Sequence, residues 1–258
     1  MLIDSHCHLN YPGLVEDEAA VLARAADAGV TAMISIATRE SEWAAVIAGA
    51  ERNAHVFATV GIHPHEADLH PDMDTVRLVE AAQHPKVVGI GETGLDYYYD
   101  KSDRERQRRS FRSHIAASRQ TGLPLIVHTR DAEADTAAIL TGEMGQGVFP
   151  LVIHCFTASR ALAETCLALG AYISISGIVT FRNAKDLAAT AAWLPADRLL
   201  VETDAPFLAP VPVRGRTCEP AHVAHTARFL AGIRGVSEGE LMETTARNTL
   251  ALFGKMAI

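Results

Sequence analysis

The sequence is poor in aromatic residues and in cysteine. Aromatic residues make up 6% of its 258 residues, whereas hydrophobic residues make up 48% and charged residues 21%. This balance is typical of a globular protein with a sizeable core, and it excludes a mostly disordered chain. The four cysteines are irregularly spaced and form no CxxC pair, which argues against a disulfide scaffold or a zinc ribbon. We therefore expect reduced thiols at Cys7, Cys155, Cys166 and Cys218.

Long apolar runs and a basic charge balance are also missing. No run reaches the roughly 18 apolar residues of a transmembrane helix, and Asp4 interrupts the N-terminus where a signal peptide would need an apolar core. We expect a cytoplasmic protein with no membrane contact and no obligate protein partner. The net charge of −8 argues against a protein that coats nucleic acid, but it allows a phosphate to be held locally by metal ions or arginines.

Short runs rich in Val, Ile and Leu recur eight times along the chain. Most are continuously apolar, as expected for parallel strands that are covered on both faces. Segments with helical spacing lie between them. The predicted strands span residues 2–6, 31–37, 56–62, 87–92, 124–128, 151–154, 171–176 and 199–204. The predicted helices include residues 16–28, 41–52, 103–121, 160–169 and 183–194, with two more at 220–232 and 237–253.

The repeated unit is a strand, a loop, a helix and a turn. Eight such units in about 250 residues favour the α/β class and a (β/α)₈ TIM barrel, whose active sites lie at the C-terminal ends of the strands. A doubly wound open sheet is the alternative, but its glycine fingerprint is missing after the first strand, where the chain has Ser5-His6-Cys7-His8. Because no linker or low-complexity tract interrupts the pattern, we predict one domain over residues 1–258.

Potential metal ligands stand at the ends of five predicted strands. A single histidine after an apolar strand is more often a rim residue than a ligand. Several histidines and two carboxylates in one funnel, however, would be costly without a compensating cation. Six ligands suit two divalent ions better than one, with a carboxylate as the bridge. The six candidates are His6, His8, Glu92, His128, His154 and Asp204.

Weaker signals surround this predicted centre. His63 and His65 follow the third strand, so we expect them at the same end of the barrel as the six candidate ligands. They are either substrate contacts or loop caps. Arg130 is placed to reach a substrate phosphate or to pair with Asp131. Arg214 follows the eighth strand, where barrels often bind phosphate, but surface solvation explains it equally well.

Two further segments have a plain and a functional interpretation. Tyr97, Tyr98 and Tyr99 are suited to stacking on a nucleobase, although packing of a loop is the commoner role of such a cluster. The arginines between residues 104 and 109 are interrupted by glutamate, and we interpret them as a solvated helix face.

Seven motifs along nearly the whole chain together resemble the TatD family of metal-dependent deoxyribonucleases, which belongs to the wider amidohydrolase-like barrels. The motifs are DSHCHLN (4–10), VGIHPHEA (60–67), IGETGLDYYYD (90–100), IVHTRDA (126–132), HCFTAS (154–159), ETDAPFLAP (202–210) and ARNTLALFG (246–254). The resemblance implies the same six metal ligands, with Glu92 as the bridge. It also implies phosphodiester hydrolysis, by a 3′–5′ exodeoxyribonuclease that acts on DNA 3′ ends.

The sequence departs from the family pattern at two places. Ala158 stands where the family usually has glycine, and Cys218 lies within Arg216–Pro220, where the family has an RNEP-like stretch. Both departures fall in expected substrate loops, so they concern substrate geometry rather than metal binding. A carboxylated lysine, which bridges the metals in many relatives of the wider superfamily, is not indicated, because Lys86 precedes the fourth strand.

The expected mechanism uses two divalent ions, Mg²⁺, Mn²⁺ or Zn²⁺, to activate water and to neutralise charge on the phosphate. We expect Glu92 and Asp204 to be catalytic, with Asp204 orienting and deprotonating the water. His63, His65, Arg130 and Arg214 are the expected substrate contacts.

Two other functions use the same residues. A small-molecule metallohydrolase would cleave an ester, lactone, cyclic amide or aminoacyl bond, and a mouth lined mainly by apolar side chains would favour it. A binding or structural module that merely holds metal is the third hypothesis, and the complete ligand set argues against it.

Overall fold

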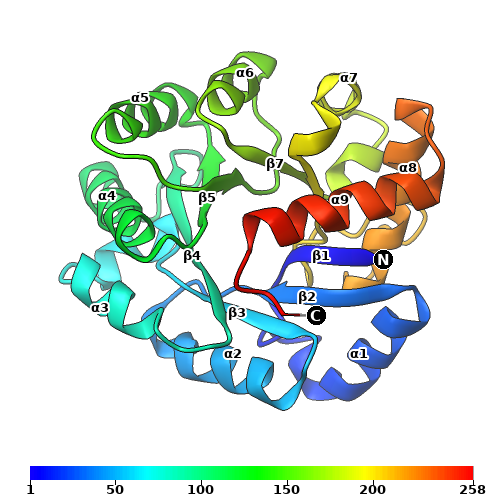
Figure 1. Ribbon diagram of the computed structural model, residues 1–258, viewed down its shortest axis with the longest axis horizontal. Helices are drawn as coiled ribbons and strands as arrows, with labels where there is room; N and C mark the ends of the chain where they lie inside the picture. Colours follow the sequence, from blue (N-terminus) through cyan, green and yellow to red (C-terminus); the bar gives the residue numbers. More distant parts are fainter. Residues whose placement is uncertain (258) are drawn as a thin grey trace.

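The computed structural model describes residues 1–257 and places eight parallel strands side by side in the order of the sequence (Figure 1). Hydrogen bonds from the backbone N–H groups of His8 and Asp204 to the carbonyls of Ala205 and His6 join the last strand to the first. The predicted (β/α)₈ barrel is confirmed. The strands are Leu2–Cys7 (β1), Val30–Ser35 (β2), Val56–Val60 (β3), Val87–Asp96 (β4), Leu125–Arg130 (β5), Leu151–Ile153 (β6), Tyr172–Ile175 (β7) and Leu199–Val201 (β8).

Helices form a ring around the strands (Figure 1). They are Glu18–Asp27 (α1), Glu40–Arg52 (α2), Thr75–Ala81 (α3), Arg104–Thr121 (α4), Glu133–Met144 (α5), Arg160–Ala168 (α6), Lys185–Trp193 (α7), Val223–Arg234 (α8) and Glu238–Leu252 (α9). Among residues 1–257, none of them combines the length and the apolar character that crossing a bilayer requires.

Three differences from the predicted elements have physical causes. The helices α3 and α5 were not predicted from the sequence, because neither has a long stretch of apolar residues at helical spacing. α3 has only seven residues, and α5 buries only three residues, one of which is the polar Thr136. The strand β4 does not end at Glu92 but continues to Asp96, because it stays paired with β5 as far as Arg130. The strand β8 ends at Val201, three residues before Asp204.

The interior of the barrel is apolar at one end and polar at the other. Ile3, Ile34, Phe57 and other inward-facing strand residues pack against Leu252 and Phe253 at the end of α9. Accordingly, α9 lies across one end of the barrel in Figure 1. The opposite end, where the strands terminate, is left for functional side chains.

Lys86 lies at the N-terminal end of β4, away from those side chains. Its ammonium donates to the carbonyls of Asn53, Ala54 and Val56 at 3.1, 2.9 and 3.1 Å. These bonds hold the start of β3, which agrees with the expectation that Lys86 bridges no metals. The four cysteines are free, as predicted.

A buried histidine of α4 holds the segment that follows β3. His114 Nε2 accepts a hydrogen bond from the Ile62 N–H at 2.9 Å, and Nδ1 donates to the Ser110 carbonyl at 2.7 Å. Burial lowers the pKa of His114 from 6.5 to about 4, so the ring is neutral near pH 7. This neutral ring positions the backbone next to His63.

We expect His114 to make folding sensitive to acid. Its pKa is lower in the folded protein than in the unfolded chain, so the unfolded chain binds more protons and stability is lost as the pH falls from 6.5 to about 4. Between about pH 7.5 and about pH 5, the wild type should lose about 2 kcal/mol more than His114→Gln. Urea unfolding of both proteins at the two pH values measures this, and equal losses would refute it.

Candidate metal centre

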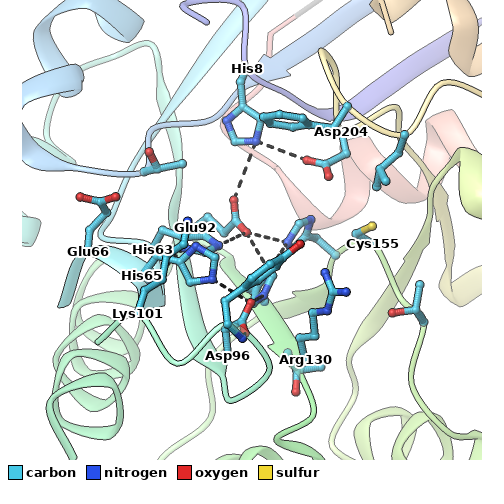
Figure 2. A pocket seen from close by; sticks show the side chains of 18 of the residues that line it. His8, His63, His65, Glu66, Glu92, Asp96, Lys101, Arg130, Cys155 and Asp204 are labelled. Carbon is cyan, nitrogen blue, oxygen red and sulfur yellow. Dashed lines mark hydrogen bonds and ion pairs between the residues drawn. The ribbon is translucent and has the colours of Figure 1, made fainter. Parts of the chain in front are cut away.

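Glu92 lies at the middle of the polar end of the barrel, and its side chain is 3% exposed. Its two carboxylate oxygens face different histidines. Oε2 lies 3.4 Å from His6 Nε2 and 3.9 Å from His8 Nε2, whereas Oε1 lies 3.1 Å from His128 Nδ1 and 2.8 Å from His154 Nε2. Figure 2 shows Glu92 between His8 on one side and Asp96 on the other. The carboxylate therefore joins two sets of imidazoles.

Asp204 completes the first set. Its Oδ1 lies 3.5 Å from His6 Nε2 and 3.3 Å from His8 Nε2. We call His6 and His8, which face Oε2 of Glu92, together with Asp204 the first donor group. His128 and His154, which face Oε1, are the second donor group. All six residues that the sequence singled out as ligands thus lie together, although they come from five different strands or the segments just after them.

The spacing within these groups suits a cation. Ligands about 2.0–2.2 Å from one tetrahedral ion lie about 3.3–3.6 Å from one another. The Nε2 atoms of His6 and His8 are 3.3 Å apart, and so are His128 Nδ1 and His154 Nε2. Nitrogen lone pairs that converge at this distance repel one another unless a proton or a metal ion lies between them. The nitrogen and carboxylate donors fit Zn²⁺, Mn²⁺ or a related divalent ion.

The charges of the site are set by burial and by close pairs. Burial alone would raise the pKa of Glu92, but the surrounding imidazoles outweigh it and hold the pKa well below its ordinary value. Asp204 behaves likewise, since His8 and His6 lower its pKa against the effect of burial. Both carboxylates are therefore ionised near neutral pH, as metal ligands must be.

Burial and nearby carboxylates act in opposite directions on the pKa of each histidine in the site, and the balance differs from one histidine to the next. Burial lowers the pKa of His6. For His8 and His154, burial acts in the same direction, but the nearby carboxylates raise the pKa: chiefly Asp204 for His8, and Glu92 with Glu202 for His154. A metal cation bound at these nitrogens would therefore compete with protons.

Asp96 lies behind the second donor group and was missed by the sequence analysis. Its Oδ2 lies 3.1 Å from His128 Nε2 and 2.9 Å from His65 Nε2. Burial alone would raise the pKa of Asp96, but these histidines lower it below its ordinary value, and Asp96 with Glu92 raises that of His128. A carboxylate bonded to the outer nitrogen of a ligating histidine fixes the tautomer and the orientation of the ring. The alternation of side chains along a strand could have revealed Asp96, because residues 92 and 96 lie on the same face of β4.

Glu202 plays the same part behind His154. Its Oε1 lies 3.4 Å from His154 Nδ1 and accepts a 2.7 Å hydrogen bond from the Cys155 N–H. The Glu202 side chain is fully buried, so it lies inside the barrel against the outer side of the His154 ring. In the sequence, only the position of Glu202 two residues before Asp204 could have indicated that it belongs to the site.

His63 reaches the centre but differs from the ligand candidates. Its Nε2 lies 3.4 Å from Glu92 Oε1, and its Nδ1 accepts a hydrogen bond from the His65 N–H at 3.0 Å. Burial lowers the pKa of His63 to about 4, so the ring is neutral. A neutral ring that accepts at Nδ1 carries its proton on Nε2. That N–H thus faces Glu92 Oε1 at the cavity wall and offers no lone pair to a metal.

The two arginines occupy different surroundings. Arg130 lines the cavity over the donor groups, and within residues 1–257 its guanidinium has no carboxylate within 4.0 Å, Asp131 included. Arg214 stacks on Phe181, with 3.9 Å from the guanidinium carbon to the ring centroid, and it is not among the residues that line the cavity. The structure therefore brings His63, His65 and Arg130 to the centre but not Arg214.

The cavity itself has a volume of about 780 Å³. Most of the residues that line it are polar or charged, and its aliphatic and phenyl side chains in the described chain are Ala158, Ile178, Phe207 and Leu208. Ala158, one of the two departures from the family pattern, therefore borders the space for substrate. Cys218, the other, is buried.

Comparisons with known proteins agree with this architecture. The family described as TatD related DNase matches residues 3–254. The chain is 44% identical to an uncharacterized metal-dependent hydrolase, YcfH, of Escherichia coli K12, with 98% of this chain and 95% of that protein covered. It is 36% identical to the 3′-5′ ssDNA/RNA exonuclease TatD of Enterobacter lignolyticus, with 98% and 99% covered.

A solved structure is similar as well. The YjjV protein of E. coli K12, a TatD homologue, superposes with a TM-score of 0.87 at 32% identity, and 98% of each chain is covered. Since the family match, the relatives and this structure all span nearly the whole chain, the protein belongs to the TatD family of metal-dependent hydrolases.

Proposed function

We propose that this protein is a two-metal phosphodiesterase that removes nucleotides from the 3′ end of single-stranded DNA. The observation that carries the proposal is the position of Glu92, whose two oxygens face two separate donor groups. A carboxylate shared in this way is typical of hydrolases that place two ions about 3.5–4 Å apart around a phosphate. A TatD relative named as a 3′-5′ ssDNA/RNA exonuclease supports the choice of substrate.

The proposed ligands are His6, His8 and Asp204 for one ion, His128 and His154 for the other, and Glu92 for both. When bound, such ions supply Lewis acidity, which lowers the pKa of water toward about 7 and neutralises charge that develops on the phosphate.

The chain's own residues would orient the water and the phosphate. Asp204 engages His6 and His8 through Oδ1, and within residues 1–257 its Oδ2 makes no hydrogen bond. Its side chain is 16% exposed and borders the cavity, so Oδ2 is placed to orient a water and to accept its proton. The Nε2–H of His63 and the guanidinium of Arg130 would donate to phosphate oxygens.

The lining of the cavity favours phosphate over a neutral carbonyl substrate. A small-molecule metallohydrolase would use the same ions, and a mainly apolar mouth would have supported it. Because most of the residues that line the mouth are polar or charged, and because Arg130 among them has no carboxylate partner within residues 1–257, we propose phosphodiester hydrolysis rather than hydrolysis of an ester, lactone or cyclic amide.

A labelled oligonucleotide tests the proposal. Purified protein, loaded with Mg²⁺, Mn²⁺ or Zn²⁺, should release the label from the 3′ end of single-stranded DNA before any 5′ label is shortened to a mononucleotide. Chelation, or the double variant His128→Ala, Asp204→Ala, should abolish the release. The matched control is His84→Ala, a histidine outside the donor groups whose Nε2 contacts Glu51. Release that survives chelation would refute the proposal, as would turnover of simple esters and lactones without any turnover of DNA.

A further inference from the structure

Two tyrosines of the loop after β4 are exposed beside the metal centre. Tyr98 is 56% exposed and Tyr99 is 51% exposed, although both rings are large and partly apolar. Their centroids lie 4.9 Å apart with the ring planes at 88°. Tyr99 borders the cavity and also contacts His65, with 5.3 Å between the ring centroids. Tyr99 therefore stands at the edge of the space where substrate would enter, and Tyr98 lies against it.

Tyr97, in the same loop, has a structural role. It packs against the hydrophobic core, and its hydroxyl donates to Asp135 at 2.6 Å. Neither kind of contact is found for Tyr98 or Tyr99 within the described residues. The core-packing role that a tyrosine cluster commonly has thus applies to Tyr97 and not to Tyr98 or Tyr99.

Arg130 joins the two exposed rings. Its guanidinium carbon lies 4.1 Å from the centroid of Tyr98 and 4.8 Å from that of Tyr99. Because it forms no ion pair within residues 1–257, its N–H donors are available to a ligand. We call Tyr98, Tyr99 and Arg130 the tyrosine platform. In Figure 2, Arg130 and Asp96 lie on one side of Glu92, and His8 and Asp204 lie on the other.

The backbone of the platform is fixed to the metal centre. Asp96 Oδ1 accepts hydrogen bonds from the N–H groups of Tyr98 and Tyr99 at 3.0 and 2.9 Å, while its Oδ2 contacts His128 and His65. The loop conformation is therefore held by Asp96 and does not depend on packing of the two rings. One carboxylate sets both the orientation of a proposed ligand and the position of the platform.

We propose that the tyrosine platform is a nucleobase subsite, on which a base next to the scissile phosphate stacks while Arg130 holds the phosphate. The inference rests on the nuclease function proposed above. Aromatic rings and arginine planes bind bases of any sequence, because every base has a flat π face. A base inside a duplex has both faces covered by its neighbours, so stacking on the platform requires an unpaired strand end. The subsite thereby selects single-stranded substrates.

A double variant with its own rescue tests the subsite. Tyr98→Leu, Tyr99→Leu removes the π faces and keeps apolar bulk, whereas Tyr98→Phe, Tyr99→Phe retains the faces. The control is Trp193→Ala, which removes an exposed aromatic ring that also lies against an arginine, Arg160 at 4.1 Å, but does not border the cavity. Each protein is given oligothymidylate, the same strand with 5,6-dihydrothymine in its last two nucleotides, and methyl p-nitrophenyl phosphate. Dihydrothymine keeps the polar groups of thymine but is not planar.

The wild type, the Phe variant and the Trp193 control should each favour thymine over dihydrothymine about tenfold in kcat/KM. The Leu variant should lose that preference, and its kcat/KM should fall more on oligothymidylate than on methyl p-nitrophenyl phosphate, which carries no nucleobase. The subsite is refuted, while the nuclease function stands, if the Leu variant keeps the full preference for thymine. It is refuted likewise if the kcat/KM of the Leu variant falls equally on oligothymidylate and on methyl p-nitrophenyl phosphate. If the wild type hydrolyses the small diester but neither oligonucleotide, the proposed nuclease function fails and the subsite fails with it.

Discussion

Replacement of Glu92 by glutamine should reduce kcat/KM on single-stranded DNA by more than about 10³-fold, because one side chain serves both donor groups. The amide keeps the size of the carboxylate but has no charge, and its NH₂ group cannot act as a ligand. Steady-state hydrolysis gives the rate, and equilibrium dialysis against Mn²⁺ should show fewer bound ions than in the wild type.

Glu133→Gln is the matched control for this change. Glu133 also borders the cavity, but its carboxylate accepts from the Ser159 N–H and hydroxyl and belongs to neither donor group. Its replacement should leave hydrolysis close to the wild-type rate. Comparable activity of the two variants would show that Glu92 is not shared between two ions.

Gly94→Ala should destabilise the protein by about 3–6 kcal/mol, a large part of the roughly 5–15 kcal/mol that holds a domain together. Gly94 has a φ of +132°, and a Cβ atom there would lie 2.0 Å from the carbonyl oxygen of His128. The close approach of β4 to β5 at this pair is what brings Glu92, Asp96 and His128 together. Little or no folded protein is expected, and urea unfolding of the soluble fraction measures the loss.

Gly142→Ala provides the contrast. Gly142 lies in α5, and no heavy atom outside its own helix backbone lies within 4 Å of its added Cβ. Alanine is the better helix former, so this variant should gain up to about 1 kcal/mol. If both alanine variants proved equally stable, the close packing at Gly94 would not be required.

The strands and their shared polar end were predictable because continuously apolar runs recur along the chain and because parallel strands of a barrel all end on the same side. The position of Asp96 was not predictable, because β4 was expected to end at Glu92. The strand continues to Asp96 through its pairing with β5. The position of the Arg214 side chain was not predictable either, because its contact with Phe181 depends on how two distant segments of the chain meet. The tautomer of His63 likewise follows from a backbone hydrogen bond that residue spacing does not reveal.

The central claim is that two ions share Glu92, and anomalous diffraction tests it most directly. Crystals of the wild-type protein grown with Mn²⁺ would be measured on both sides of the manganese absorption edge. We expect two peaks about 3.5–4 Å apart, one beside His6, His8 and Asp204 and the other beside His128 and His154. A single peak, or a pair that does not flank Glu92, would contradict the account.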